Sequence, residues 1–347
     1  MINRTLARIR VFQQLFAYNH GGVLSLKGAE TQLRKSLHIS HTLYLYLLDL
    51  VPRLTALHAE NVERRRNKML RTESDINPNL KMVNNRLAKA LDESELLSEA
   101  LQQESLSWRS NDDLLRQLLE ELLASDIYKE YSNSPEDDFD EDVDFWVAAL
   151  QKVVFRNTLL DDYLEDLSPY WDNPSRVTEK IEIEQMPDLD NVEDVVTESR
   201  INNAYQASRL SISPVEIEKD FALKTLRRSR GATSIDDLIL PEYKSEDDEL
   251  FPLELLRAAV VHEEFIRKKV EEKLKNWATD RLTDTDLVAI QLGAAELLTF
   301  PDIPAVVTIN EYIELVKCFS TQKSGPFVNG ILDAILQDLR AEKRLAK

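Results

Sequence analysis

Hydrophobic residues recur every three or four positions through most of the chain, which is the pattern of amphipathic α-helices. The pattern predicts a first helix over residues 2–18, a second over 25–38, and a third that begins with Ser40 as its N-cap and is kinked by Pro52. Glycine supports the same class, since only 7 of 347 residues are glycine and tight β-turns or phosphate-cradling loops need it. We therefore expect an all-α fold of at least ten helices with no sheet.

Caps and turns divide the region 279–340 into three further helices. Thr283 or Asp284 is the expected cap of the first, and Thr308 and Glu311 form a T-x-x-E capping box that is expected to open the second. The last helix is expected to begin at the sequence Ser-Gly-Pro, residues 324–326. Farther upstream, helices are expected near 201–211 and 214–228.

Three tryptophans mark an internal repeat. When Trp108, Trp171 and Trp277 are aligned without gaps, apolar residues coincide at five preceding offsets, two of which are adjacent. The aligned sets are Leu87, Leu150 and Leu256; Leu91, Val154 and Val260; the pairs Leu96-Leu97, Leu159-Leu160 and Phe265-Ile266; and Leu101, Leu164 and Val270. The spacing suits a helical hairpin closed by a tryptophan, and we expect all three tryptophans to be core residues.

Charge is unevenly distributed along the chain. The formal net charge is −19, yet residues 1–72 carry +8, residues 92–200 carry −23 and residues 317–347 carry +3. We expect an acidic loop at 133–144 and a mobile segment near 172–200. The predicted organisation is a basic N-terminal part of a bundle at 1–72, an acidic helical insertion at 73–245 and a C-terminal helical subdomain at 246–347.

Several classes of function are disfavoured by composition. The single cysteine, Cys318, rules out an internal disulfide framework and a multi-cysteine zinc site, and we expect it to be a buried thiol in a reducing, cytoplasmic compartment. The histidines form no metal-binding motif, so no metal ion or cofactor is expected. No segment has the long apolar run of a membrane span or of a signal peptide.

The segment FPDIPAVVTINEYIELVKCFSTQKSGPFVNGILDAIL, residues 300–336, resembles the C-terminal half of the NusB family of transcription antitermination factors. The similar features are Glu296 before the turn, the D-[IV]-P turn, the I-N-E-x-I-E-L-x-K helix and the F-V-N-G-x-L-D helix. The N-terminal INRTLARIRVFQQLFAY is similar to the family's arginine-rich first helix. The resemblance implies a NusB-like bundle of two helical subdomains, here with additional helical hairpins inserted.

The resemblance also implies a function. Family members bind the boxA element of nascent RNA together with NusE, a small ribosomal-subunit protein, in the RNA polymerase antitermination complex, and they have no enzymatic activity. Carried onto this sequence, the expected RNA-binding residues are Arg4, Arg8, Arg10, Lys317, Lys323, Ser324 and Phe327. Arg4 and Arg8 share one flank of the first helix and Arg10 lies on the other, and such cations suit the phosphates of single-stranded RNA. Two departures change the local charge: Gln291 stands where many members have arginine, and Lys323 stands where short members have an acid.

Two other classes of function remain as alternatives. A helical protein–protein scaffold could keep the fold without RNA binding, in which case Arg4 and Arg8 are solvated and Phe327 is a core residue. A methyltransferase carrying a NusB-like domain would need a nucleotide-binding domain with glycine turns, and no GxGxxG sequence occurs here. Binding of a short single-stranded RNA separates the first alternative from the RNA-binding interpretation.

Overall fold

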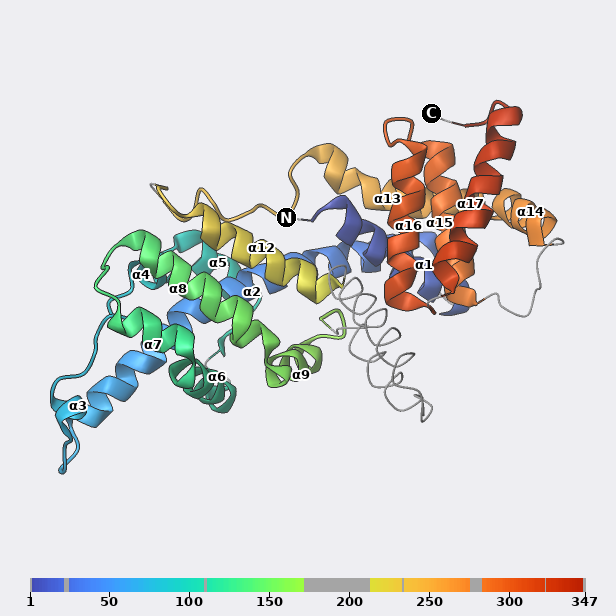
Figure 1. Ribbon diagram of the computed structural model, residues 1–347. Coiled ribbons are helices and arrows are strands. Elements are labelled where there is room, and N and C mark those ends of the chain that lie inside the picture. Colours follow the sequence, from blue (N-terminus) through green and yellow to red (C-terminus); the bar gives the residue numbers. More distant parts are fainter. Residues whose placement is uncertain are drawn as a thin grey trace, which may run out of the picture. The chain divides into compact units, whose positions relative to one another are not determined.

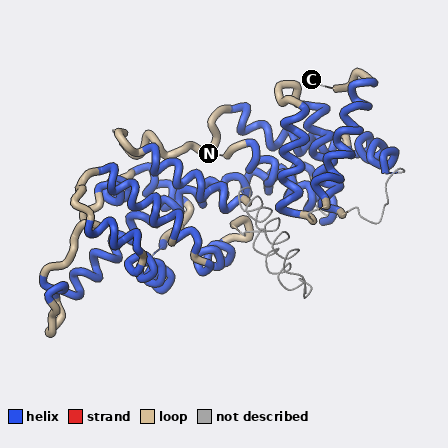
Figure 2. Tube along the Cα trace, viewed as in Figure 1, coloured by secondary structure: helices blue, strands red, loops and turns tan. Residues whose placement is uncertain are grey.

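The computed structural model describes residues 2–21, 25–108, 111–171, 213–232, 234–274, 283–321 and 323–345 (Figure 1). In these ranges every regular element is a helix and there is no strand, which confirms the all-α class (Figure 2). The helices are α1 (Arg4–Gly21), α2 (Leu26–Arg66), α3 (Glu73–Ile76), α4 (Arg86–Asp92), α5 (Glu95–Gln103), α6 (Asp112–Ala124), α7 (Asp126–Asn133), α8 (Phe139–Lys152), the 3-10 helix η2 (Val154–Arg156), α9 (Thr158–Leu167), α12 (Pro214–Arg228), α13 (Glu246–Val261), α14 (Glu263–Leu274), α15 (Asp284–Thr299), α16 (Ala305–Phe319) and α17 (Ser324–Ala341).

The chain forms two compact units. The terminal unit contains the described residues of 2–38, 213–217 and 242–345, and the middle unit contains those of 39–171 and 218–241. Residues 39–72, which the sequence analysis grouped with the N-terminal bundle, lie in the middle unit. None of the described helices is long and apolar enough to cross a membrane.

The terminal unit joins the two ends of the sequence. Helix α1 packs on α13 and α15, and α15, α16 and α17 pack on one another. Leu6, Ile9 and Leu15 of α1 are almost fully buried, and so are Leu292 of α15 and Leu332 of α17. The expectation that the basic N-terminal helix lies beside the 279–340 helices is confirmed for α1.

The middle unit has an aromatic core against α2. The ring of Trp108 stacks on Tyr46 with centroids 3.9 Å apart, and its indole N–H donates to the Tyr46 carbonyl over 2.9 Å. Trp171 donates in the same way to the carbonyl of Ile39 over 2.9 Å. Both tryptophans therefore attach the segments that follow α5 and α9 to one helix, α2.

The repeat has a common geometry. The second helix of each copy, α5, α9 or α14, begins 13, 13 or 14 residues before the aligned tryptophan. At the paired offset the second residue is buried in all three copies, namely Leu97, Leu160 and Ile266, while Leu96 and Leu159 are largely exposed. Each copy therefore contains two successive helices with buried residues at matching offsets, whereas Trp277 lies outside the described residues.

Three local expectations are wrong. Residues 26–66 form one continuous helix, so Ser40 is buried inside α2 and does not cap a new helix. Helix α16 begins at Ala305 after Pro304, which places Thr308 inside it and not at its N-cap. The expected acidic loop is helical from Phe139 onward, because acidic side chains in a first turn interact favourably with the helix dipole.

Some local expectations are confirmed, and others concern residues outside the described ranges. Thr283 caps α15, its hydroxyl accepting from the backbone N–H of Asp286, and α12 covers the helix expected at 214–228. Cys318 is buried and is not part of a disulfide. The segments 172–200 and 201–211 lie outside the described residues.

Candidate functional site

Arg8 lies inside the terminal unit, bound to two glutamates. Its guanidinium donates from Nε to Glu296 Oε2 over 2.8 Å and from Nη2 to Glu296 Oε1 over 2.9 Å. Nη1 donates to Glu311 Oε2 over 3.2 Å. The side chains of Arg8 and Glu296 are 4% and 0% exposed, so this bidentate pair is almost fully desolvated. It ties α1 to α15 and α16 across 288 positions of sequence.

Hydroxyl groups complete the coordination of Glu296. Thr308 Oγ1 donates to Oε1 over 2.8 Å, and the Tyr312 hydroxyl donates to Oε2 over 3.1 Å. Burial together with the charge of Glu296 raises the pKa of Tyr312 well above its usual value, so the phenol stays neutral. Burial opposes the charge of Arg8, but its hydrogen bond and Coulomb attraction to Glu296 prevail and raise its pKa. The network therefore contains a permanently charged, fully paired arginine.

Two of the three arginines of α1 are buried, although their positions on the flanks of the helix predicted that they would be accessible. Arg8 and Arg10 are 3% and 2% exposed, and Arg10 donates to Gln13 over 2.9 Å. The physical reason is that α1 packs on two other helices and lies deeper than a one-sided amphipathic helix would. Arg4 is different: its side chain is 42% exposed, 3.4 Å from Asp248, with its guanidinium 5.0 Å from the centre of the Phe251 ring.

The start of α17 brings together an exposed lysine and a buried serine. Lys323 is exposed, whereas Ser324 is 3% exposed and its hydroxyl lies 3.2 Å from Asp286 Oδ2, to which it donates. Ser320 donates to the other oxygen of Asp286 over 2.8 Å. A buried carboxylate therefore accepts two hydroxyl groups at the junction of α15, α16 and α17.

The two remaining candidates are partly exposed. Lys317, near the end of α16, forms an ion pair with Glu314 over 2.6 Å and keeps 28% of its side chain exposed. Phe327, in the first turn of α17, is intermediate in exposure. The solvent-accessible candidates are thus Arg4, Lys317, Lys323 and, in part, Phe327.

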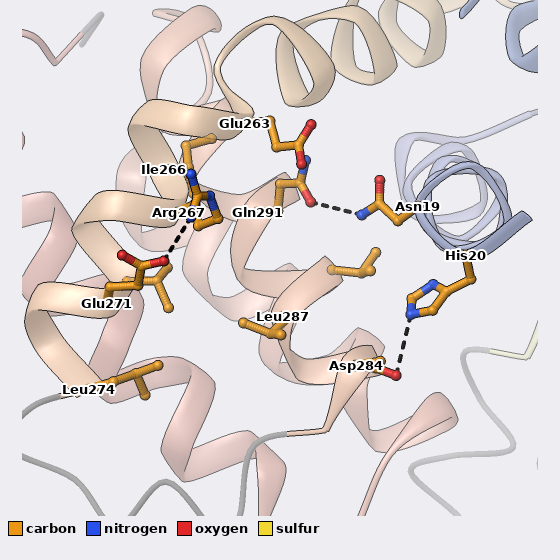
Figure 3. A pocket seen from close by; sticks show the side chains of 12 residues that line it. Asn19, His20, Glu263, Ile266, Arg267, Glu271, Leu274, Asp284, Leu287 and Gln291 are labelled. Atoms are coloured by element: carbon orange, nitrogen blue, oxygen red, sulfur yellow. Dashed lines mark hydrogen bonds and ion pairs between the residues drawn. The ribbon is translucent and has the colours of Figure 1, made fainter. Parts of the chain in front are cut away.

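Gln291 lies at the edge of a cavity of about 440 Å³ between the end of α1, α14 and α15 (Figure 3). Its amide nitrogen donates to the Ala259 carbonyl over 3.0 Å, and its amide oxygen accepts from Asn19 over 3.1 Å. The His20–Asp284 pair, 3.3 Å apart, also lines this cavity. A glutamine thus satisfies both neighbours without the charge that an arginine would add.

The sequence did not predict the roles of the residues around Arg8. Glu296 was expected only as a feature shared with the family, and Thr308 and Glu311 were expected to form a capping box. Both side chains instead bind partners on other helices, Thr308 binding Glu296 and Glu311 binding Arg8, because tertiary partners compete successfully with local backbone bonds. The usable signal was an acid in the apolar helix α15, since a buried carboxylate requires a cation. Among the described residues, no cluster of three or more His, Cys, Asp or Glu side chains is suited to hold a metal ion.

Comparison with known proteins places these elements in a family. The model of the NusB family matches residues 212–337. The protein named transcription antitermination protein NusB from Methylacidiphilum infernorum is 46% identical over 83 residues, which are 24% of this chain and 58% of that protein. The protein of the same name from Geotalea daltonii is 45% identical over 89 residues, 26% of this chain and 61% of that protein.

A third relative is covered more fully. The transcription antitermination protein NusB from Desulfatibacillum aliphaticivorans is 37% identical over 97 residues, 28% of this chain and 68% of that protein. The chain thus spans about three-fifths of the length of the first two relatives and just over two-thirds of the third. No solved structure matches the chain.

Proposed function

The chain belongs to the NusB family, and from this we propose that it is a non-enzymatic transcription antitermination factor of the cytoplasm. Its proposed ligand is a boxA-like single-stranded RNA, bound together with NusE in the RNA polymerase antitermination complex that acts on ribosomal RNA transcription. The observation that carries the proposal is the joining of α1 to α15 and α16 by Arg8 and Glu296. The two segments that resemble the family thereby belong to one folded unit.

The proposed RNA contacts are the accessible residues of the candidate set. Arg4, Lys317 and Lys323 supply cations for phosphates, which single-stranded RNA binding requires. Phe327 supplies a ring that can stack on a base, because part of it reaches solvent. None of these roles requires a rearrangement of the helices.

The buried candidates have a different proposed role. Arg8, Arg10 and Ser324 are each at most 3% exposed, so a phosphate would have to displace protein partners to reach them. We propose that Arg8 positions α1 against α16, and that Ser324 fixes the first turn of α17 through Asp286. In this proposal Arg8 and Ser324 do not contact RNA themselves but hold in place the helix ends that carry Arg4 and Lys323.

The scaffold alternative is favoured by one specific observation. Of the five basic side chains first assigned to RNA, Arg8 and Arg10 are buried, and Arg4 and Lys317 already face acidic partners. A protein with this surface would bind RNA more weakly than one with five free cations. A measured affinity decides between the two functions.

The test is a fluorescence anisotropy titration of labelled boxA-like RNA with and without NusE. The variant Arg4→Ala/Lys317→Ala/Lys323→Ala should lower affinity at least tenfold, since each lost phosphate contact weakens binding. The matched control is Arg267→Ala/Lys268→Ala/Lys343→Ala, which removes three other exposed cations of the same unit. An equal loss in both variants would reduce the effect to net charge, and no binding by the wild type would leave the scaffold function.

A further inference from the structure

The loop after α2 carries the most exposed hydrophobic side chains of the described chain. Met69 is 102% exposed and Leu70 is 91% exposed, relative to a reference residue. Ile76, at the end of the short helix α3, is 57% exposed. In Figure 1 this part of the middle unit extends beyond its other helices. Exposure of two adjacent apolar side chains to water costs free energy. Binding of a partner that covers them is therefore favourable.

The same loop is strongly basic. Residues 64–71, which we call the basic tip, contain five cations and no acid: Arg64, Arg65, Arg66, Lys68 and Arg71. Arg66 pairs with Glu63 over 3.0 Å. Arg64, Arg65 and Lys68 form no ion pair with any residue that the structure describes. Three cations therefore remain available beside Met69 and Leu70.

The charge of the basic tip is opposite to that of its surroundings. The rest of the middle unit, residues 39–63, 72–171 and 218–241, contains 31 acidic and 14 basic residues. Basic residues near the end of α2 interact favourably with its helix dipole, but that effect is confined to the last turn. The helix dipole therefore explains the basic residues Arg64 and Arg65. It does not explain Lys68 and Arg71, which lie beyond the helix, or the exposure of Met69 and Leu70.

We propose that the basic tip is a docking surface for an acidic polypeptide segment that carries apolar side chains. Carboxylates of the partner would pair with Arg64, Arg65 and Lys68, and its apolar side chains would cover Met69 and Leu70. Each part of the tip is then used, since charge complementarity guides the encounter and apolar burial supplies affinity. This function is independent of RNA binding by the terminal unit.

Two other anionic partners fit less well. Single-stranded RNA is held by aromatic side chains on which bases stack, and residues 64–76 contain no aromatic residue. Phosphates would pair with the cations and leave Met69 and Leu70 in water. An anionic membrane would cover them, but it would repel the acidic remainder of the middle unit. An acidic peptide is small enough to avoid that repulsion.

The test uses the full chain and a synthetic amphipathic peptide with leucines at helical spacing among glutamates. Its control peptide has serine at each leucine position. We expect the leucine peptide to bind at least tenfold more tightly than the serine peptide, as measured by anisotropy. Met69→Ser/Leu70→Ser should remove that difference, and Arg64→Ser/Arg65→Ser/Lys68→Ser should weaken binding of both peptides.

Matched variants come from the same unit. Lys89→Ser/Arg116→Ser/Lys129→Ser removes three exposed cations that pair within their own helices, and Leu96→Ser/Leu159→Ser removes two exposed leucines. Both should bind like the wild type, with unchanged circular dichroism. No binding, equal binding of the two peptides, or tighter binding of an oligouridine or of anionic phospholipid vesicles would each overturn the proposal. RNA binding by the terminal unit would be unaffected in every case.

Discussion

The terminal and middle units differ in what lies at their centres. In the terminal unit, the charged pair of Arg8 and Glu296 is surrounded by Thr308 and Tyr312. In the middle unit, the corresponding position is taken by stacked rings, those of Tyr46 and Trp108. Both units are all-helical, and both join segments far apart in sequence. The cluster around Arg8 uses directional hydrogen bonds between charges, and the stack at Tyr46 uses apolar area with two indole N–H bonds.

The difference has consequences for how each unit fails. A buried ion pair fixes which helices meet, but breaking it leaves an uncompensated charge. An aromatic stack contributes chiefly through area, so its loss leaves a cavity. Each unit should therefore lose stability for a different physical reason when the residues at its centre are replaced.

Trp108→Ala should destabilise the middle unit most. The ring is fully buried and stacked, and its N–H bond to Tyr46 is lost with it. We expect a loss of about 5 kcal/mol in the free energy of unfolding, the upper end for such truncations. Urea denaturation followed by circular dichroism measures it. The exposed Leu96→Ala is the control, and a loss in Trp108→Ala as small as in that control would mean that the stack contributes little.

Arg8→Met should destabilise the terminal unit by about 3–5 kcal/mol, because Glu296 then stays buried without a cation. The double variant Arg8→Met/Glu296→Leu should recover most of this loss, since no fully buried charge remains without a partner and the Glu311 side chain, 29% exposed, keeps contact with water. Arg4→Met, on the same helix but exposed, serves as the control in the same denaturation experiment. If the double variant is as unstable as Arg8→Met, the ion pair itself stabilises the folded state. The loss in Arg8→Met would then not come from the uncompensated charge of Glu296.

Gly293→Ala tests how tightly α15 packs against its neighbours. A Cβ at this position would lie 2.9 Å from both Cδ atoms of Leu332 and 3.1 Å from Cδ2 of Tyr312. We expect a loss of about 1–3 kcal/mol from overpacking. Gly21→Ala is the matched control, because no atom lies within 4 Å of its added Cβ. Equal melting temperatures for the two variants would show that Leu332 and Tyr312 move aside without cost.

The smallest effect is expected from acidification, and it should appear in the middle unit. His58 is 5% exposed, and neither ring nitrogen has a hydrogen-bond partner among the described residues. Burial, with a contribution from Arg65, lowers the pKa of His58 below its usual 6.5. The folded state therefore binds fewer protons than the unfolded one, and stability should fall as the pH drops below about 6.5.

The measurement for His58 is urea denaturation at several pH values. His58→Phe should remove the part of the acid-side slope that the wild type owes to this group. An unchanged slope in His58→Phe would place the acid sensitivity elsewhere.

The sequence predicted helices better than it predicted what their polar residues do. The first two tryptophans of the repeat and the cap Thr283 rest on local spacing, and the structure has them where spacing places them. Thr308 fits a capping box equally well by spacing, yet it is used by Glu296, a residue of another helix. The burial of Arg8 could not be predicted for the same reason. The sequence of α1 alone indicates one buried face and exposed flanks, whereas Arg8 is buried by α15, whose Glu296 is 288 positions away.

The most direct test of the account is the salt dependence of boxA-like RNA binding in two variants. We predict that Lys323→Ala lowers the slope of log affinity against log salt concentration by about 0.7, the value for one lost phosphate contact on a single strand. Arg8→Met/Glu296→Leu, which keeps the net charge and the fold, should retain the wild-type slope. An unchanged slope in Lys323→Ala together with a reduced one in the double variant would contradict the account, because the buried arginine would then be the residue that contacts RNA.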